Sequence, residues 1–211
     1  WASLPEGATV ATSSLRRRAQ LLHLRPDLRI ADIRGNVDTR LAKLEARSEW
    51  SAILLATAGL VRLGQAHRIS ERLDPEVMLP APGQGALAVT ARSDDPSAAG
   101  AVRTALHHAA SAMAVAAERA FLRRLEGGCQ VPVAAYAELR GAEGAPALHL
   151  RGRVVSLEGE RASEGSADRR VGSEADADAM GVALAERLLG EGAAEILAAV
   201  RLAASPPIAE P

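Results

Sequence analysis

The stretch TVATSSLRRRAQLLHL, residues 9–24, contains the sharpest change of residue pattern in the chain. Thr9–Thr12 is a short run of residues typical of β-strands, and Leu15–Leu24 has apolar residues at helical spacing. The hydroxyl residues between the two runs are good helix caps, and Pro26 stops the helix soon after its last apolar residue. The stretch therefore predicts a strand that turns directly into a helix.

The same alternation continues through the first 78 residues. Leu28–Ile33 and Ala52–Ala56 are further candidate strands, and Val37–Ala46 between them is a candidate helix with one apolar face. Strands that alternate with helices favour a mainly parallel sheet. Residues 1–78 are therefore predicted to form an α/β domain, and their pattern also resembles one lobe of periplasmic-binding-like folds.

Residues 79–104 are predicted to connect this domain to the rest of the chain. The sequence LPAPGQGA, residues 79–86, is rich in proline and glycine, which are typical of loops and crossings. The apolar run Ala86–Thr90 follows it and is expected to form one strand.

Residues 105–202 are predicted to form a small α+β domain, in which helices cover an antiparallel sheet. The tail, residues 203–211, contains three prolines and no apolar periodicity, so we expect it to be disordered. In chain order the predicted elements are a helix over Ala109–Leu125, strands over Val131–Leu139, Leu148–Val155 and Glu160–Arg170, and helices over Asp176–Leu189 and Ala193–Leu202.

Composition favours a globular protein, because 48% of the 211 residues are hydrophobic, which is enough to bury one generous core or two modest ones. No run approaches the ~20 apolar residues that a membrane span needs, and the first residues do not read as a secretory signal, so we expect a cytoplasmic protein. The single cysteine excludes an intramolecular disulfide, and no Cys/His spacing indicates a metal site.

Serines and arginines gather where the first predicted helix begins: Ser13, Ser14, Arg16 and Arg17. Unpaired N–H groups and the helix dipole favour an anion at such a helix start, and guanidinium groups bind carboxylates or phosphates through paired hydrogen bonds. The same residues could also be an ordinary cap followed by arginines in solvent. This motif alone does not decide between the two interpretations.

Arginines also follow the other two predicted strands of this domain. Arg34 follows the second predicted strand, Arg40 lies in the next helix, and Arg62 follows the third strand. The carboxyl ends of parallel strands meet at one edge of a sheet, where such sheets place their ligands. The convergence therefore predicts a site for a polyanionic ligand.

Another stretch with residues that could carry chemistry is LEGGCQVP, residues 125–132. Cys129 follows two glycines between a predicted helix and a predicted strand, so its thiol is expected on a loop that a bulky group can approach. Most lone cysteines are inert small hydrophobic residues, and the loop by itself does not distinguish the two cases.

Four motifs, TSSLRR, RGNV, LPAPGQGA and LEGGCQVP, occur here in the order and spacing seen in hydroxymethylbilane synthases (porphobilinogen deaminases), which the chain resembles from about Leu4 to Val200. The resemblance implies a transferase of tetrapyrrole (heme) biosynthesis. Such enzymes condense four porphobilinogen units head to tail, with loss of ammonia, on a dipyrromethane primer, and then release hydroxymethylbilane by hydrolysis. It also implies that Cys129 attaches the dipyrromethane cofactor covalently.

Each pyrrole of the growing chain carries an acetate and a propionate group, so the resemblance also gives the arginines a role. The residues that match carboxylate-binding positions of the family are Ser13, Ser14, Arg16, Arg17, Arg34, Arg40 and Arg62. The implied partners are porphobilinogen and the linear pyrrole chain, with no nucleic acid and no membrane.

The chain also departs from the family pattern. The catalytic aspartate of the family lies in an N-terminal domain ahead of the TSSLRR motif, and nothing in these 211 residues matches it; Asp32 and Asp38 lie near the arginines but outside the motif. We therefore expect no catalytic residue here and no turnover by this chain alone. The family is monomeric, whereas the apolar run within residues 79–92 would here lack its partners from that domain, so we expect self-association through it.

Two other classes of protein share some of these features. A non-catalytic module that binds anions or polycarboxylates would share the arginines but has no need of the Gly-Gly-Cys loop. A nucleic-acid-binding protein could use Ser13–Arg29 as a basic helix, but the net charge of −1 and the scarcity of aromatic residues argue against it.

Overall fold

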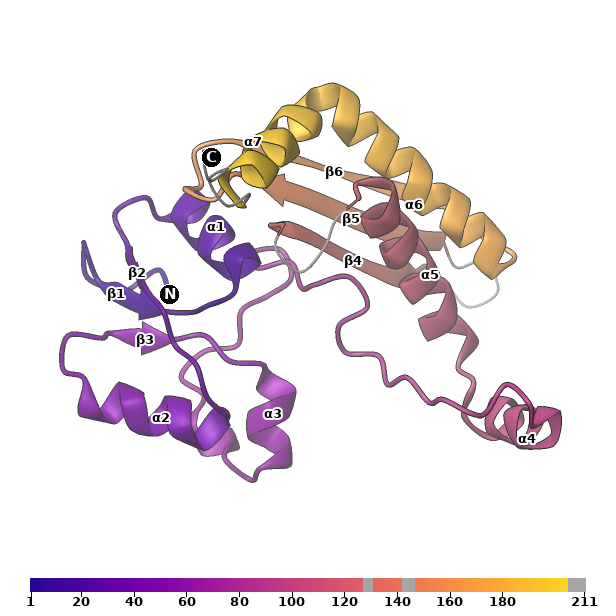
Figure 1. The fold of residues 1–211 in the computed structure, drawn as a ribbon, viewed down its shortest axis with the longest axis horizontal. Helices are drawn as coiled ribbons and strands as arrows, with labels where there is room; N and C mark the ends of the chain where they lie inside the picture. Colours follow the sequence, from indigo (N-terminus) through magenta and orange to yellow (C-terminus); the bar gives the residue numbers. More distant parts are fainter. Residues whose placement is uncertain (127–130, 142–146, 205–211) are drawn as a thin grey trace, which may run out of the picture.

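The computed structural model describes residues 1–126, 131–141 and 147–204. Two bodies follow one another along the chain, an α/β domain with a parallel sheet and an α+β domain with an antiparallel sheet (Figure 1). This arrangement confirms the predicted fold class. Within the described ranges, no helix is both long and apolar enough to span a bilayer.

The α/β domain is built on three parallel strands in the order β2-β1-β3. The hydrogen-bonded strands are shorter than the apolar runs that predicted them, because apolar spacing reports burial rather than the length of a ladder. Leu28 and Ile33, for example, lie outside β2 yet are buried. The elements are β1 (Thr9–Ala11), α1 (Leu15–Leu24), β2 (Arg29–Ala31), α2 (Val37–Ala46), β3 (Ala52–Ile53), α3 (Thr57–Arg62) and a short 3₁₀ turn (Ala66–Arg68).

Local hydrogen bonds explain where the first two helices begin. Ser14 caps α1 by accepting from the backbone N–H of Arg17, and Asn36 caps α2 by accepting from Thr39 at 2.8 Å. A small core of Ala8, Val10, Leu21 and Leu28 then packs the sheet against α1. Residues 9–24 therefore do form a strand that turns into a helix.

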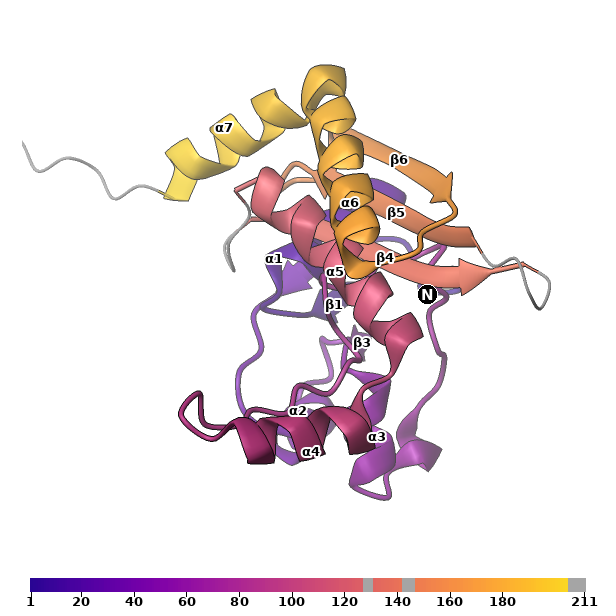
Figure 2. The ribbon, with the colours of Figure 1, turned by 90° about the vertical axis from the view of Figure 1, so that its right-hand side faces the viewer.

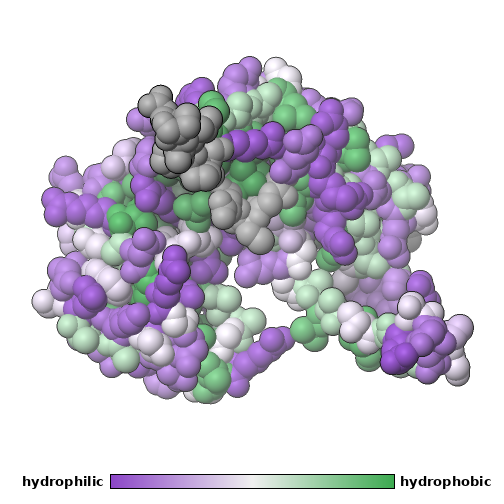
Figure 3. Space-filling model, in the orientation of Figure 1, coloured by the Kyte–Doolittle hydropathy of each residue, from purple (hydrophilic) through white to green (hydrophobic). Residues whose placement is uncertain are grey.

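Ala86–Thr90 forms no strand in the structure: these residues have no neighbouring strand to pair with and are exposed, so the expectation that they pair with another domain stays a prediction. Leu87 is 80% exposed and Val89 55% exposed. Figure 3 shows apolar surface in this region, between the body of the molecule and the helix that follows. The start of the connector behaves differently, since Leu79 is buried with both of its backbone groups hydrogen-bonded by Gln20.

A helix that the sequence analysis did not predict, α4 (Pro96–Leu106), follows the exposed run. The sequence does contain residues typical of a helix start. Asp95 caps the helix by accepting from the N–H of Ala98, and proline occupies its first position. The helix has no buried residue and stands away from both domains (Figure 1).

The α+β domain matches its prediction within a few residues at each boundary. Its sheet has the order β4-β5-β6, antiparallel throughout, and one face packs against the helices in a single apolar core (Figure 2). The elements are α5 (Ala109–Arg124), β4 (Val133–Arg140), β5 (Ala147–Val155), β6 (Ala162–Arg169), α6 (Glu174–Leu188), a π-helical turn (Leu189–Ala193) and α7 (Ala194–Ala204).

Two glycines permit unusually close packing in this core. A Cβ on Gly181 of α6 would lie 2.1 Å from the carbonyl oxygen of Ala117 in α5, so the two helices touch backbone to backbone. A Cβ on Gly152 of β5 would lie 2.4 Å from the ring of Phe121, which is fully buried above the strand. The helices lie this close to one another and to the sheet because these positions have no side chain.

The two domains meet through polar contacts. The tight turn between β5 and β6 packs on the end of α1, where the Gly159 carbonyl oxygen lies 2.8 Å from Nδ1 of His23. Beside it, Arg18 of α1 forms an ion pair with Glu158 of the same turn. Arg153 reaches across the interface from near the end of β5. These contacts join α1 to the sheet of the α+β domain.

Candidate carboxylate-binding site

The candidate site lies where the three parallel strands end and α1 begins. Ser13 ties two strand ends together, because its hydroxyl accepts from the N–H of Ile33 at 3.0 Å and donates to the carbonyl oxygen of the same residue at 2.8 Å. Ser14 caps α1, as described above. Both predicted serines therefore shape the site through backbone contacts.

Arg16 and Arg17, the first arginines of α1, are half-buried and donate to backbone carbonyls rather than to carboxylates. Arg16 donates from Nη1 to the carbonyl oxygen of Leu79 at 2.6 Å and from Nη2 to Oε1 of Gln84 at 3.4 Å. Arg17 donates from Nη1 to the carbonyl oxygen of Leu54 at 3.0 Å. The carbonyls hold the guanidinium groups in place but do not neutralise their charge.

The electrostatics of these two arginines follow from that arrangement. Burial, and then the nearby charge of Arg17, lower the pKa of Arg16 to about 10. Burial, and then the charge of Arg40, lower the pKa of Arg17. Three guanidinium groups from two helices therefore raise one another's energy, and a bound carboxylate would relieve that repulsion.

Arg40, Arg34 and Arg62 lie around the same sheet edge but differ in their surroundings. Arg40 of α2 is half-buried and donates from Nε to the carbonyl oxygen of Gly35 at 2.7 Å. Arg34 and Arg62 are exposed, and Lys43 donates from Nζ to the Arg34 carbonyl oxygen at 2.9 Å. Across the described ranges, none of the five predicted arginines forms an ion pair with an acidic side chain.

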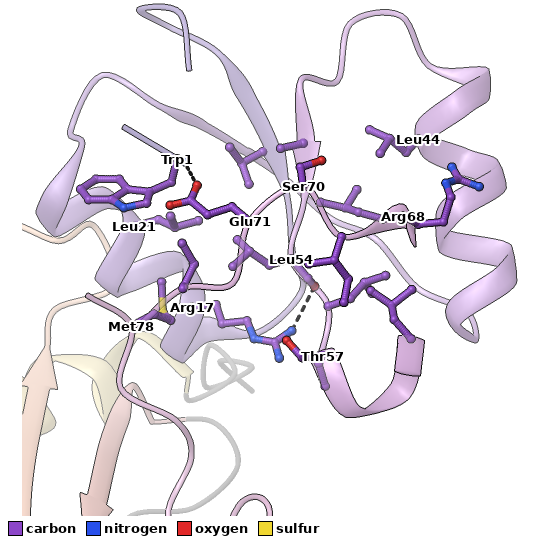
Figure 4. Close-up of a pocket in the computed structure, with 18 of the residues that line it drawn as sticks. Trp1, Arg17, Leu21, Leu44, Leu54, Thr57, Arg68, Ser70, Glu71 and Met78 are labelled. Carbon is purple, nitrogen blue, oxygen red and sulfur yellow. Dashed lines mark hydrogen bonds and ion pairs between the residues drawn. The ribbon is translucent and has the colours of Figure 1, made fainter. Parts of the chain in front are cut away.

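A cavity of about 650 Å³ opens beside β3 and the start of α1. Figure 4 shows Arg17 pointing into it near Leu54 and Thr57, with Glu71 on the opposite wall. Arg16 also lines the cavity, whereas Arg34, Arg40 and Arg62 do not. The structure therefore brings Arg16 and Arg17 together at a cavity and places Arg40 close enough to Arg17 to lower its pKa, whereas Arg34 and Arg62 lie outside the cavity lining.

Cys129 lies outside the described residues. On either side of it, α5 ends at Arg124 and β4 begins at Val133. Leu125 and Val133 are buried in the core of the α+β domain. In the described ranges, no group of three His, Cys, Asp or Glu side chains could hold a metal ion.

Two glutamines were not among the predicted site residues. Gln20 of α1 holds Leu79, and Gln84 contacts Arg16, so each supports an arginine of the site. Gln84 could have been predicted as a site residue, because it belongs to the LPAPGQGA motif. Nothing in the sequence indicates the role of Gln20, because a polar residue on a predicted helix does not reveal a partner 59 residues away.

Fold and site together define a two-domain protein whose parallel α/β half presents arginines without an acidic partner to a cavity of about 650 Å³. Comparison with known families agrees with this class. The model described as "Porphobilinogen deaminase, dipyromethane cofactor binding domain" matches residues 1–100, and that described as "Porphobilinogen deaminase, C-terminal domain" matches residues 112–190. The chain belongs to the porphobilinogen deaminase family, which are transferases of tetrapyrrole biosynthesis.

Proposed function

We propose that this chain supplies the carboxylate-binding half of a hydroxymethylbilane synthase, which condenses four porphobilinogen units with loss of ammonia. The observation that carries the proposal is the pair Arg16 and Arg17. They are half-buried at a helix N-terminus beside a cavity, with lowered pKa values and only uncharged acceptors. A buried guanidinium without an anion is unfavourable, so the site favours a ligand that brings carboxylates.

The donor set suits a dipyrromethane cofactor, whose two pyrroles carry acetate and propionate groups. Arg16, Arg17 and Arg40 would hold those groups, Arg34 and Arg62 would reach them from the rim, and Cys129 would form the thioether. When bound, this cofactor supplies the pyrrole carbon to which porphobilinogen units are added.

The chain's own residues bind and orient. The guanidinium of Arg17 has five N–H donors, and the Leu54 carbonyl takes one of them, which leaves a planar pair for a carboxylate. The Leu79 carbonyl and Gln84 likewise hold Arg16. Because these supports are fixed by the fold, little side-chain freedom is lost when a carboxylate binds.

Turnover is a separate matter from binding. Neither Asp32 nor Asp38 lines the cavity, and Asp38 accepts from Gln65 at 2.6 Å. General acid–base groups contribute about 10²–10⁴-fold to such reactions. We therefore propose that residues 1–211 by themselves bind porphobilinogen but do not condense it.

Calorimetric titration with porphobilinogen tests the binding proposal. Arg17→Lys should weaken the affinity by about 10-fold, because a lysine cannot form the paired hydrogen bonds of a guanidinium. The matched control is Arg103→Lys on the exposed helix α4, which should leave the affinity unchanged. Equal affinities for all three proteins, or no binding by the unaltered chain, would contradict the proposal.

A non-catalytic polycarboxylate-binding module is the second candidate, because the described residues include binding groups without an evident general acid. Intact mass before and after thiol alkylation separates the two. A synthase that joins residues 1–211 to a family N-terminal domain should carry a dipyrromethane adduct on Cys129, whereas residues 1–211 alone should show an unmodified, alkylatable thiol. An alkylatable thiol in both would favour the binding module.

A further inference from the structure

A buried arginine of the α+β domain contacts the α/β domain close to the proposed site. Arg153 of β5 is 6% exposed. Its Nε donates to Glu164 of β6 at 2.6 Å, which neutralises its charge within its own sheet. Its Nη1 crosses the interface and donates to Oε1 of Gln20 at 3.1 Å and to the carbonyl oxygen of Val77 at 3.3 Å.

Gln20 passes this contact on to the connector between the domains. Its Oε1 also accepts from the N–H of Leu79 at 3.0 Å, and its Nε2 donates to the carbonyl oxygen of Leu79 at 3.1 Å. A guanidinium can only donate, so Arg153 fixes which end of the amide faces it. Arg153 and the Leu79 N–H both donate to Oε1, so the Gln20 Nε2 points at the Leu79 carbonyl.

The Leu79 carbonyl is also where Arg16 is held. Arg16 Nη1 donates to that oxygen at 2.6 Å, so one acceptor serves both Gln20 and a site arginine. An unbroken series of hydrogen bonds thus runs from Arg153 to Arg16, between domains that are adjacent in space but far apart in sequence.

We propose that Arg153 is a positioning residue for the carboxylate site and acts on Arg16 through Gln20 and Leu79. The proposal rests on the proposed function for its ligand, but its geometry does not depend on it. Without Arg153, the Gln20 amide loses its partner from the α+β domain and is held by Leu79 and the Arg16 carbonyl, so the Leu79 carbonyl, and with it the Arg16 guanidinium, is held less firmly. Docking of the α+β domain therefore sets the affinity of a site that lies in the other domain.

A double-mutant cycle tests the proposal by porphobilinogen titration. Arg153→Met should weaken binding by about 3- to 10-fold, a size typical of indirect coupling. In a protein that already carries Arg16→Gln, the same change should have no further effect, because its route of action is gone. An unchanged affinity in Arg153→Met, or a full additional loss in the double variant, would overturn the proposal.

Arg18→Met is the matched control. It removes an arginine of the same interface, whose partner Glu158 has no contact with Gln20 or Leu79. A general loosening of the interface would weaken binding in this variant too, so equal effects of Arg18→Met and Arg153→Met would also overturn the proposal.

Two further measurements keep the test decisive if Arg153→Met does not fold or if the unaltered chain does not bind porphobilinogen. Arg153→Lys keeps the charge opposite Glu164 but lacks the second nitrogen that reaches Gln20, so it should fold and show the same loss of affinity. The ¹⁵N–¹H signal of Arg16 Nε should shift in Arg153→Lys and not in Arg18→Met, with no ligand present. If the unaltered chain does not bind porphobilinogen, the proposed function fails, and this signal still decides the positioning role.

Discussion

Glu118 of α5 is a buried carboxyl group that joins three segments of the chain. Its oxygens accept from the N–H of Ala137 at 2.7 Å and from the N–H of Gly83 at 2.5 Å. Burial raises its pKa to about 7, although both hydrogen bonds act in the opposite direction. Between its ordinary value of 4.5 and about 7, the folded protein therefore keeps a proton that the unfolded chain has lost.

The free energy of unfolding should consequently fall as the pH rises from about 5 to about 8, by on the order of 3 kcal/mol from this group alone. Glu118→Gln should remove that part of the pH dependence, although it lowers stability at every pH because its NH₂ group faces a backbone donor. Urea denaturation at pH 5 and pH 8 measures both effects, with exposed Glu45→Gln as the control. An equally steep pH dependence in Glu118→Gln would show that another group titrates.

Helix packing gives a prediction at the scale of elements. Gly181→Ala should destabilise the α+β domain by about 1–3 kcal/mol, because its Cβ would overlap the Ala117 carbonyl and force α5 and α6 apart. Gly100→Ala in α4 is the same change in a helix with open space around it, so it should not destabilise the protein. Thermal denaturation of both variants provides the comparison, and an unaltered melting temperature for Gly181→Ala would contradict the packing argument.

Two parts of the connector between the domains should differ in their rates of amide hydrogen exchange. Amides of Ala86–Thr90 should exchange rapidly in dilute solution, whereas the amides of Leu79 and Gly83 should be protected by Gln20 and Glu118. At high concentration we expect protection of Ala86–Thr90 to increase, because an exposed apolar run with unpaired backbone groups is a template for a second copy. Protection that is strong at every concentration would instead mean that the run pairs within its own chain.

The elements differ in how well their sequence predicted them. Runs of apolar residues with caps, such as Leu15–Leu24, carried enough local information for their type and bounds to be right. Ala86–Thr90 has the composition of a strand, but a strand also needs a neighbour, and composition does not supply one. Helix α4 was missed because its alanine-rich sequence has no buried face to reveal it. For the site, local motifs indicated the arginines, whereas the interdomain partner of Gln20 depends on tertiary structure.

At the scale of the whole molecule, the two domains have separate cores of very unequal size, joined by polar contacts. The α/β domain, with the smaller core, should unfold at lower urea concentration than the α+β domain. Both tryptophans, Trp1 and Trp50, lie in the α/β domain, so their fluorescence should change before the far-ultraviolet circular dichroism of the long helices α5 and α6. Coincident transitions would mean that the polar interface couples the domains into one cooperative unit.

Lys43 of α2, which donates to the Arg34 carbonyl oxygen, allows ligand binding at the site to be followed by proteolysis. The 25 basic residues of the chain include this one lysine, so a protease that cleaves only after lysine has a single peptide bond to attack, Lys43–Leu44. That bond lies inside a helix and can be cut only when the helix opens. Because Arg40 stands one turn away, a carboxylate that binds there would keep the helix closed, and the rate of this one cut would report occupancy of the site without any label.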